Sequence, residues 1–443
     1  MKTRVSTPWA FVAIVAASLG ACSSNPARST AEAAAAAPAV LLPSDSVTVH
    51  AQIAWLESRI RKDPEDFIAL NKLASQYLQI MRETGDAAYL QRALQVAQAS
   101  LASLPAERNL AGLNVLAQSE YSSHEFSVAR DHALLLTHLE PDKAYGYQIL
   151  GDALLELGDY EQAKAAFHRM EQLGTIGELP RIASKQRVAR QALLHGDLNT
   201  AHSQLVAALE LALVQPVPAR ETVAWCRWQL GEIAFSRGDY AVAEQFDRDA
   251  LTTFPGYYRA LSSLGRVRAA RGDLADAIAQ YEAAVRILPE PLLLSDLGDL
   301  YRLVGREQDA ARQYALVEAI GRLSAAGGSL YNRQLALFYA DHDLRPADAY
   351  AMATSEYAVR RDIYGADALA WTALKAGKLA EARSAMQLAL RLNTQDSKLL
   401  YHAGMIELAA ADISKARAYF DQALALNPQF DPLQSALLKK LAL

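Results

Sequence analysis

A frame of apolar, small and turn-forming residues recurs along most of this chain. It is clearest over residues 147–170, where its members are Leu150, Gly151, Leu154, Gly158, Asp159, Tyr160, Ala163 and Phe167. The same frame returns over residues 230–255, 264–289, 297–314 and 404–428. Such self-similarity indicates an array of structural repeats, in which each repeat is stacked on its neighbours.

The frame resembles the tetratricopeptide repeat (TPR), which is a pair of antiparallel helices. The resemblance implies an all-α solenoid, a right-handed superhelix of about ten helix pairs, over residues 65–428. The spacing has a physical reason. Two helices approach closely only where Gly or Ala lies at the crossing, a larger side chain fills the notch, and a proline ends the second helix.

Ten small residues mark the same position in successive repeats: Ala74, Ala117, Gly151, Ala189, Gly231, Gly265, Gly298, Ala336, Ala370 and Gly404. Five of the nine steps between them lie within one residue of the 34-residue tetratricopeptide period. The longer steps coincide with expected loops at residues 82–86, 174–180 and 215–218. Loops inserted between helices would leave the packed faces undisturbed.

Both ends of such an array need caps, because each pair exposes an apolar face that only the next pair covers. A helix within residues 47–64 is expected to cap the N-terminal end, and residues 429–443 the C-terminal end. Leu433, Leu437, Leu438 and Leu441 fall on one face of the latter helix. The alternative is an amphipathic helix that docks on a membrane or a partner.

The N-terminus resembles a bacterial lipoprotein signal peptide. Lys2 and Arg4 precede an apolar stretch of eleven residues, 9–19, which is too short to span a membrane. Leu19-Gly20-Ala21-Cys22 resembles a lipobox. The resemblance implies cleavage after residue 21, lipidation of Cys22 and a flexible tether over residues 22–46. An ordinary secretory signal with a chance cysteine is the alternative.

Serine rather than aspartate follows Cys22, and by analogy with Gram-negative lipoproteins this favours the periplasmic face of the outer membrane. The other cysteine, Cys226, lies among apolar residues and is expected in the core rather than as a reactive thiol. The net charge of −5 offers no basic excess for nucleic acid.

Catalytic chemistry has little support in the sequence. The nine histidines form no metal-binding pair at helical spacing, and no phosphate-binding loop, C-x-x-C or G-x-S-x-G motif occurs. We therefore expect no enzyme activity, no cofactor and no metal site.

Binding is the better hypothesis. In tetratricopeptide arrays the first helices line a concave groove, and matching positions at the N-terminal end are polar and nearly uncharged: Asn71, Ser75, Asn114, Gln118, Gln148 and Asp152. Further along, aromatic and basic residues predict a groove for a protein or peptide: Trp225, Trp228, Arg259, Arg266, Arg302, Arg333, Tyr364, Trp371 and Tyr401. Packing of the tryptophans between repeats, and pairing of Arg266 or Arg302 with Asp299, are alternatives.

The sequence therefore predicts a lipid-anchored tetratricopeptide protein that acts as a binding scaffold or adaptor in the bacterial cell envelope. A scaffold component of exopolysaccharide synthesis or export is the alternative function. The sequence leaves the identity of the partner and the oligomeric state open.

Overall fold

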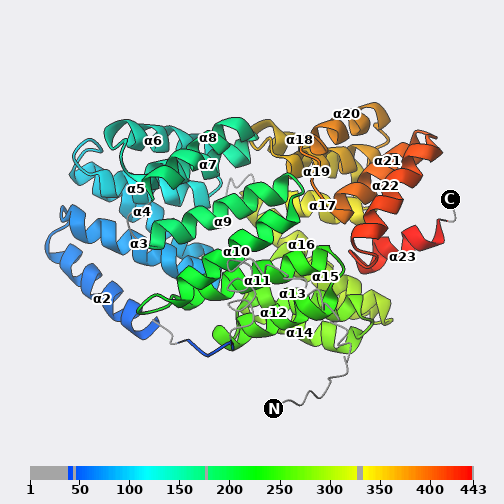
Figure 1. Ribbon diagram of the computed structural model, residues 1–443, viewed down its shortest axis with the longest axis horizontal. Helices are drawn as coiled ribbons and strands as arrows, with labels where there is room; N and C mark the ends of the chain where they lie inside the picture. Colours follow the sequence, from blue (N-terminus) through cyan, green and yellow to red (C-terminus); the bar gives the residue numbers. More distant parts are fainter. Residues whose placement is uncertain (1–37, 43–45, 175–177, 327–332, 442–443) are drawn as a thin grey trace, which may run out of the picture.

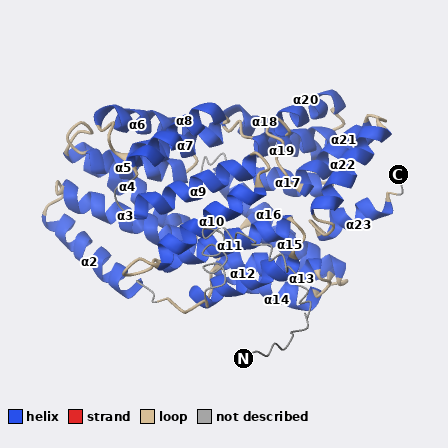
Figure 2. Cartoon of the chain, in the orientation of Figure 1, coloured by secondary structure: helices blue, strands red, loops and turns tan. Residues whose placement is uncertain are grey.

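The computed structural model describes residues 38–42, 46–174, 178–326 and 333–441. This part of the chain contains 22 helices and no strand (Figure 2). The helix α2 (Ser46–Lys62) comes first, ten antiparallel helix pairs follow, and α23 (Pro432–Lys440) comes last. The predicted all-α solenoid of about ten helix pairs is confirmed.

Each pair consists of an odd-numbered first helix and an even-numbered second helix. The first helices are α3 (Phe67–Thr84), α5 (Leu110–Ser122), α7 (Ala144–Leu157), α9 (Glu178–Leu194), α11 (Arg220–Ser236), α13 (Tyr258–Ala270), α15 (Pro291–Leu303), α17 (Arg333–Asp341), α19 (Ile363–Lys375) and α21 (Ser397–Ala409). The second helices are α4 (Ala87–Ser103), α6 (Phe126–Leu139), α8 (Tyr160–Leu173), α10 (Leu198–Leu213), α12 (Tyr240–Thr253), α14 (Leu274–Ile287), α16 (Glu307–Ala326), α18 (Pro346–Val359), α20 (Leu379–Ala389) and α22 (Ile413–Leu426).

Close approach of the two helices explains the small residues. All ten of them lie on first helices and are buried. Four of the glycines face an aromatic ring of the second helix, in the pairs Gly151–Phe167, Gly265–Tyr281, Gly298–Tyr314 and Gly404–Phe420. A Cβ atom on any of these glycines would lie less than 3.0 Å from that ring. The ring therefore fills the notch that the glycine leaves.

One predicted loop is largely helical. Residues 82–86 were expected to form a connection, but α3 continues to Thr84 and α4 begins at Ala87. Gly85 ends α3 in the left-handed conformation, at φ 74°. The helices α3 and α4 contain 18 and 17 residues, whereas α13 and α14 contain 13 and 14. Because both helices of the pair are longer, their packing on each other is preserved. The hydrophobic spacing alone did not reveal this extension.

The solenoid winds so that its second half packs on its first half. The third pair contacts the connection after the eighth, the fourth pair the connection after the ninth, and the fifth pair the connection after the tenth. Each contact thus joins pairs that are five apart in the array. Figure 1 shows the consequence, because α5–α8 and α18–α20 form one row along the top of the molecule. We call this contact between turns the axial interface.

Three hydrogen bonds define the axial interface. The backbone N–H of Ile363 donates to the Tyr160 hydroxyl at 2.8 Å. The Thr394 hydroxyl donates to the Leu194 carbonyl at 2.5 Å. The Asn427 amide donates to the Phe235 carbonyl at 2.7 Å. Because these bonds join residues that are 192 to 203 positions apart, they give the array long-range contacts beyond those between neighbouring repeats.

The two end helices pack on the first and last pairs. Val49, Ile53 and Leu56 of α2 pack on the core of the first pair. Leu438 of α23 packs in the cluster that holds Phe420 of the last pair. Leu437, predicted on the same apolar face, is instead 45% exposed. The buried face of α23 also includes Gln434 and Ser435, so it is less apolar than predicted.

The predicted signal peptide and the lipidation site Cys22 lie outside the described residues. The described end of the predicted tether lies against the body, because the N–H of Leu42 donates to the Thr253 carbonyl at 3.2 Å. Among the residues that the structure describes, none of the helices is both long enough and apolar enough to span a bilayer.

Candidate functional site

The helices α11 and α13 present an aromatic and basic cluster. Trp225 and Trp228 meet edge to face, with ring centroids 6.4 Å apart. The guanidinium of Arg259 lies 5.3 Å from the Trp228 ring centroid, and the Trp228 indole N–H donates to Glu232 at 3.0 Å. The side chains of Trp225, Trp228 and Arg259 are all half-buried. We call Trp225, Trp228 and Arg259 the central cluster.

Arg266 continues this surface along α13. Its guanidinium pairs with Glu232 and lies 4.2 Å from the ring centroid of Phe235. The sequence left open whether Arg266 pairs with Asp299, and the structure assigns it Glu232 instead. The pairing leaves Arg266 half-buried beside the central cluster, where a ligand would compete with Glu232 for its N–H groups.

Asp247 lies beneath this surface and is fully buried. Asp247 follows Gly231 by sixteen residues. In other pairs the same separation joins Gly151 to Phe167 and Gly265 to Tyr281. Within the described part of the chain, neither of its carboxylate oxygens has a hydrogen-bond partner. Burial raises the pKa of Asp247 well above its ordinary value and Glu232 raises it further, while the nearby Ser263 hydroxyl and Arg266 oppose this rise.

Two predicted groove residues belong to the core. Trp371 and Tyr401 are each 2% exposed and pack with Phe420 and Leu438. The Trp371 ring stacks on His402 at 4.2 Å, and its indole N–H donates to Asp341 at 2.8 Å. These side chains are too enclosed to contact a ligand directly. The alternative of packing between repeats therefore describes them.

The other predicted groove residues are placed in different settings. Arg333 pairs with Glu356 and Asp362, each at 2.9 Å, so it holds α17 to the next repeat rather than facing an open groove. Arg302 is exposed on α15, and Tyr364 of α19 is 38% exposed. Their role in binding stays a prediction.

The axial interface contains a buried charge cluster that sequence reasoning missed. Glu156 of α7, with a side chain only 4% exposed, pairs with Arg190 of α9 and with Arg360 at the end of α18. Burial alone would raise the pKa of Glu156, but the two guanidinium groups lower it to about 2. Residues 156 and 360 are 204 positions apart, so no local pattern could have revealed their contact.

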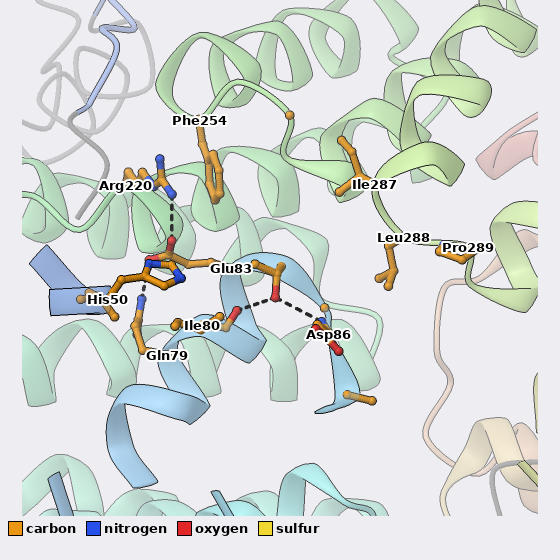
Figure 3. Close-up of a pocket in the computed structure, with 15 residues that line it drawn as sticks. His50, Gln79, Ile80, Glu83, Asp86, Arg220, Phe254, Ile287, Leu288 and Pro289 are labelled. Atoms are coloured by element: carbon orange, nitrogen blue, oxygen red, sulfur yellow. Dashed lines mark hydrogen bonds and ion pairs between the residues drawn. The ribbon is translucent and has the colours of Figure 1, made fainter. Parts of the chain in front are cut away.

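A cavity of about 690 Å³ lies where the first pair meets the later turn of the superhelix (Figure 3). On one wall, Arg220 pairs with Glu83 at 2.8 Å and stacks over Phe254 at 4.1 Å. Ile287, the last residue of α14, and Leu288, which follows it, also line the cavity. The cavity is a junction between turns, and its Arg220 and Glu83 side chains pair with each other.

A second cavity, of about 580 Å³, opens at the N-terminal end of the groove. It contains three of the predicted polar groove residues, Asn71, Ser75 and Asn114. The sequence did not predict that α2 also contributes, with Gln52 and Trp55. Trp55 was assigned only to a capping helix, because hydrophobic periodicity does not reveal which neighbour a side chain faces.

Cys226 lies in the core, as expected. It is fully buried and receives a contact from the Gln186 amide at 3.6 Å. Burial raises the pKa of its thiol to about 12, so it is unsuited to nucleophilic chemistry. In the described part of the chain, no group of three or more His, Cys, Asp or Glu side chains could hold a metal ion.

Comparison with known proteins agrees with the helix pairs. Tetratricopeptide repeat family models match residues 144–169, 229–290 and 368–429. A 56-residue segment is 38% identical to cellulose synthase operon protein C of Komagataeibacter xylinus. That segment covers 13% of this chain and only 4% of the length of that protein.

Several solved structures have a similar arrangement. The human IFIT1 dimer with PPP-AAAA is 14% identical, covers 74% of this chain and 73% of its own, and has a TM-score of 0.47. The yeast Tom70 structure is 13% identical, covers 90% and 96%, and has a TM-score of 0.41. PilW, a widely conserved type IV pilus biogenesis factor, is 17% identical, covers 47% and 91%, and has a TM-score of 0.38. From its ten helix pairs and its matches to the family models, the chain is a tetratricopeptide repeat protein.

Proposed function

We propose that this protein is a scaffold or adaptor that binds a protein partner in the bacterial cell envelope. Tetratricopeptide repeats support protein–protein interaction, and the proposed contact surface is the central cluster on α11 and α13. Half-buried tryptophan and arginine anchor protein interfaces because they combine a large contact area with hydrogen bonding. The role needs no catalytic step.

The single observation that carries this proposal is the geometry of the central cluster. Trp225, Trp228 and Arg259 come from two neighbouring repeats and meet on one surface. Arg266 and Glu232 extend that surface with a charged pair that a partner's side chains would share. An extended peptide or helix crossing the two repeats would meet aromatic and charged groups together.

Co-purification tests the proposal. Envelope proteins that accompany the intact protein are compared with those that accompany Trp228→Ala and, as a control, Val242→Ala. Val242 lies on the second helix α12 and is also exposed. We expect one discrete protein to be lost from Trp228→Ala alone. Identical sets of proteins for all three would contradict binding at the central cluster.

The proposed anchor is a lipid on Cys22 that holds the protein at the periplasmic face of the outer membrane. Its support is the L-G-A-C sequence after a short apolar stretch, with serine at position 23. Cys22→Ser should release the protein from sedimented membranes into the soluble fraction. Continued tight membrane association of this variant would contradict the anchor.

Scaffolding of exopolysaccharide synthesis or export is the second candidate function. The observation that favours it is the 56-residue similarity to cellulose synthase operon protein C. This function predicts that deletion of the gene reduces secreted polysaccharide, whereas Trp228→Ala cells secrete a normal amount. Normal polysaccharide in the deletion strain would contradict it.

A further inference from the structure

The N-terminal cavity differs in chemistry from the central cluster. Its lining combines residues of α2, α3 and α5: Gln52, Trp55, Leu56, Asn71, Lys72, Ser75, Gln76, Ala111 and Asn114. Lys72 is the only charged side chain in this set. The cavity is thus nearly neutral, whereas the central cluster is basic and paired with acidic groups.

Trp55 gives this cavity an exposed aromatic wall. The side chain is 58% exposed, which is unusual for the largest apolar residue in a folded protein. The guanidinium of Arg59 lies 5.6 Å from its ring centroid and also pairs with Asp66 at the start of α3. These contacts hold the indole at the rim while leaving most of its surface open to a ligand.

A buried polar network lies behind Asn71, which lines the cavity. The Asn71 amide donates to Asn109 at 2.7 Å, and the Ser100 hydroxyl donates to the Asn71 side-chain oxygen at 2.6 Å. The Asn109 amide donates to the Ser100 hydroxyl at 2.8 Å, which closes the network. Because these groups satisfy one another, the network holds Asn71 in place without a ligand.

The rim offers uncharged hydrogen-bonding groups. Ser75 is exposed, Gln76 and Asn114 are half-buried, and Gln52 is exposed on α2. Within the described part of the chain, the side chains of Gln52 and Gln76 form no hydrogen bond with another residue. Amides and hydroxyls both donate and accept, so this rim matches a ligand that presents many hydroxyl groups.

We propose that the N-terminal cavity binds a neutral hexose oligosaccharide. A pyranose ring has an apolar C–H face that would stack on Trp55, and an edge of hydroxyl groups that would bond to Gln52, Gln76 and Asn114. A folded protein partner would need a larger contact area, and a strongly charged ligand would meet only Lys72 in the lining, beside Arg59, which already pairs with Asp66. A polysaccharide chain fits an open cavity of this size with a single aromatic platform.

This inference rests on the second candidate function and not on protein binding at the central cluster. The two sites lie on different helices, α2–α5 against α11–α13, and each contains its own tryptophan. Replacement of one tryptophan therefore tests one site and leaves the other as its control. Loss of one activity can be distinguished from loss of the other.

A glycan array carrying neutral hexose oligosaccharides and acidic oligouronates tests the proposal. The intact protein is compared with Trp55→Ala, Trp55→Phe and Trp228→Ala, with circular dichroism to verify the helical content of each. We expect binding to neutral oligosaccharides that weakens by about tenfold or more in Trp55→Ala, with partial recovery in Trp55→Phe and no change in Trp228→Ala.

Three results would overturn the proposal. One is the absence of binding to any neutral oligosaccharide by the intact, folded protein. Another is binding that Trp55→Ala leaves unchanged, because the ligand would then occupy a different site. The third is preference for oligouronates that disappears in Lys72→Ala, because the cavity would then recognise charge and not a neutral sugar.

Discussion

Replacement of Asp247 by asparagine should stabilise the protein in a pH-dependent way. In four other pairs a Phe or Tyr ring packs on the glycine of the first helix, but at Gly231 the residue is Asp247. A Cβ on Gly231 would lie 3.0 Å from its Oδ1 atom, so the carboxyl occupies the same notch. It is buried there without a hydrogen-bond partner among the described residues.

The sign follows from proton binding. The pKa of Asp247 is raised well above 3.8 in the folded protein, because burial disfavours the charged form. Above about pH 4 the unfolded chain loses this proton while the folded protein keeps it. The free energy of unfolding therefore falls as pH rises, by up to about 1.4 kcal/mol per pH unit, until the folded-state pKa is passed. Asparagine cannot ionise and removes this loss.

The assay is urea denaturation of the wild type and Asp247→Asn from pH 4 to pH 8. Trp225 and Trp228 lie on α11 of the same pair, so tryptophan fluorescence reports on this region. The two proteins should be nearly equally stable at pH 4, and the advantage of the variant should grow with pH. Asp239→Asn, at an exposed position in the same pair, is the control. Parallel pH profiles for wild type and Asp247→Asn would refute the reasoning.

Three further predictions concern stability and reactivity. Glu156→Gln should destabilise the protein by about 1–3 kcal/mol at neutral pH, because Arg190 and Arg360 both lose a charged partner whose carboxylate is buried. Hydrogen exchange should then rise at residues 360–363, and unchanged exchange there would contradict a role in the axial interface. Gly151→Ala should cost about 1–3 kcal/mol through overpacking against Phe167, and thermal denaturation measures the loss. In the Cys22→Ser variant, Cys226 should resist iodoacetamide at pH 8 until the protein unfolds. Rapid alkylation of the native variant would show that the thiol is accessible.

The sequence was most informative about contacts within a helix pair. Gly151, Gly265 and Gly404 each lie at a helix crossing beside the ring expected in the second helix. These contacts depend on a few residues at fixed spacing, so a repeated pattern predicts them well. The same regularity predicted buried small residues at all ten positions.

Contacts between turns of the superhelix could not be predicted in this way. Glu156 and Arg360 meet only because small rotations accumulate over five repeats, and no short pattern encodes that sum. Trp371 was predicted in the groove because it directly follows Ala370, as Arg266 follows Gly265 in another repeat. Its burial against His402 and Asp341 depends on the side chains of adjacent repeats, which the position alone does not determine.

In-cell photo-crosslinking tests most directly whether the central cluster binds a protein. A photoreactive amino acid replaces Trp228 in one strain and Val242 in another, and adducts are identified by mass spectrometry. The account predicts a discrete protein adduct from position 228 and none from position 242, with the fold and expression of both variants unchanged. No protein adduct at position 228, or the same adducts at both positions, would contradict the account.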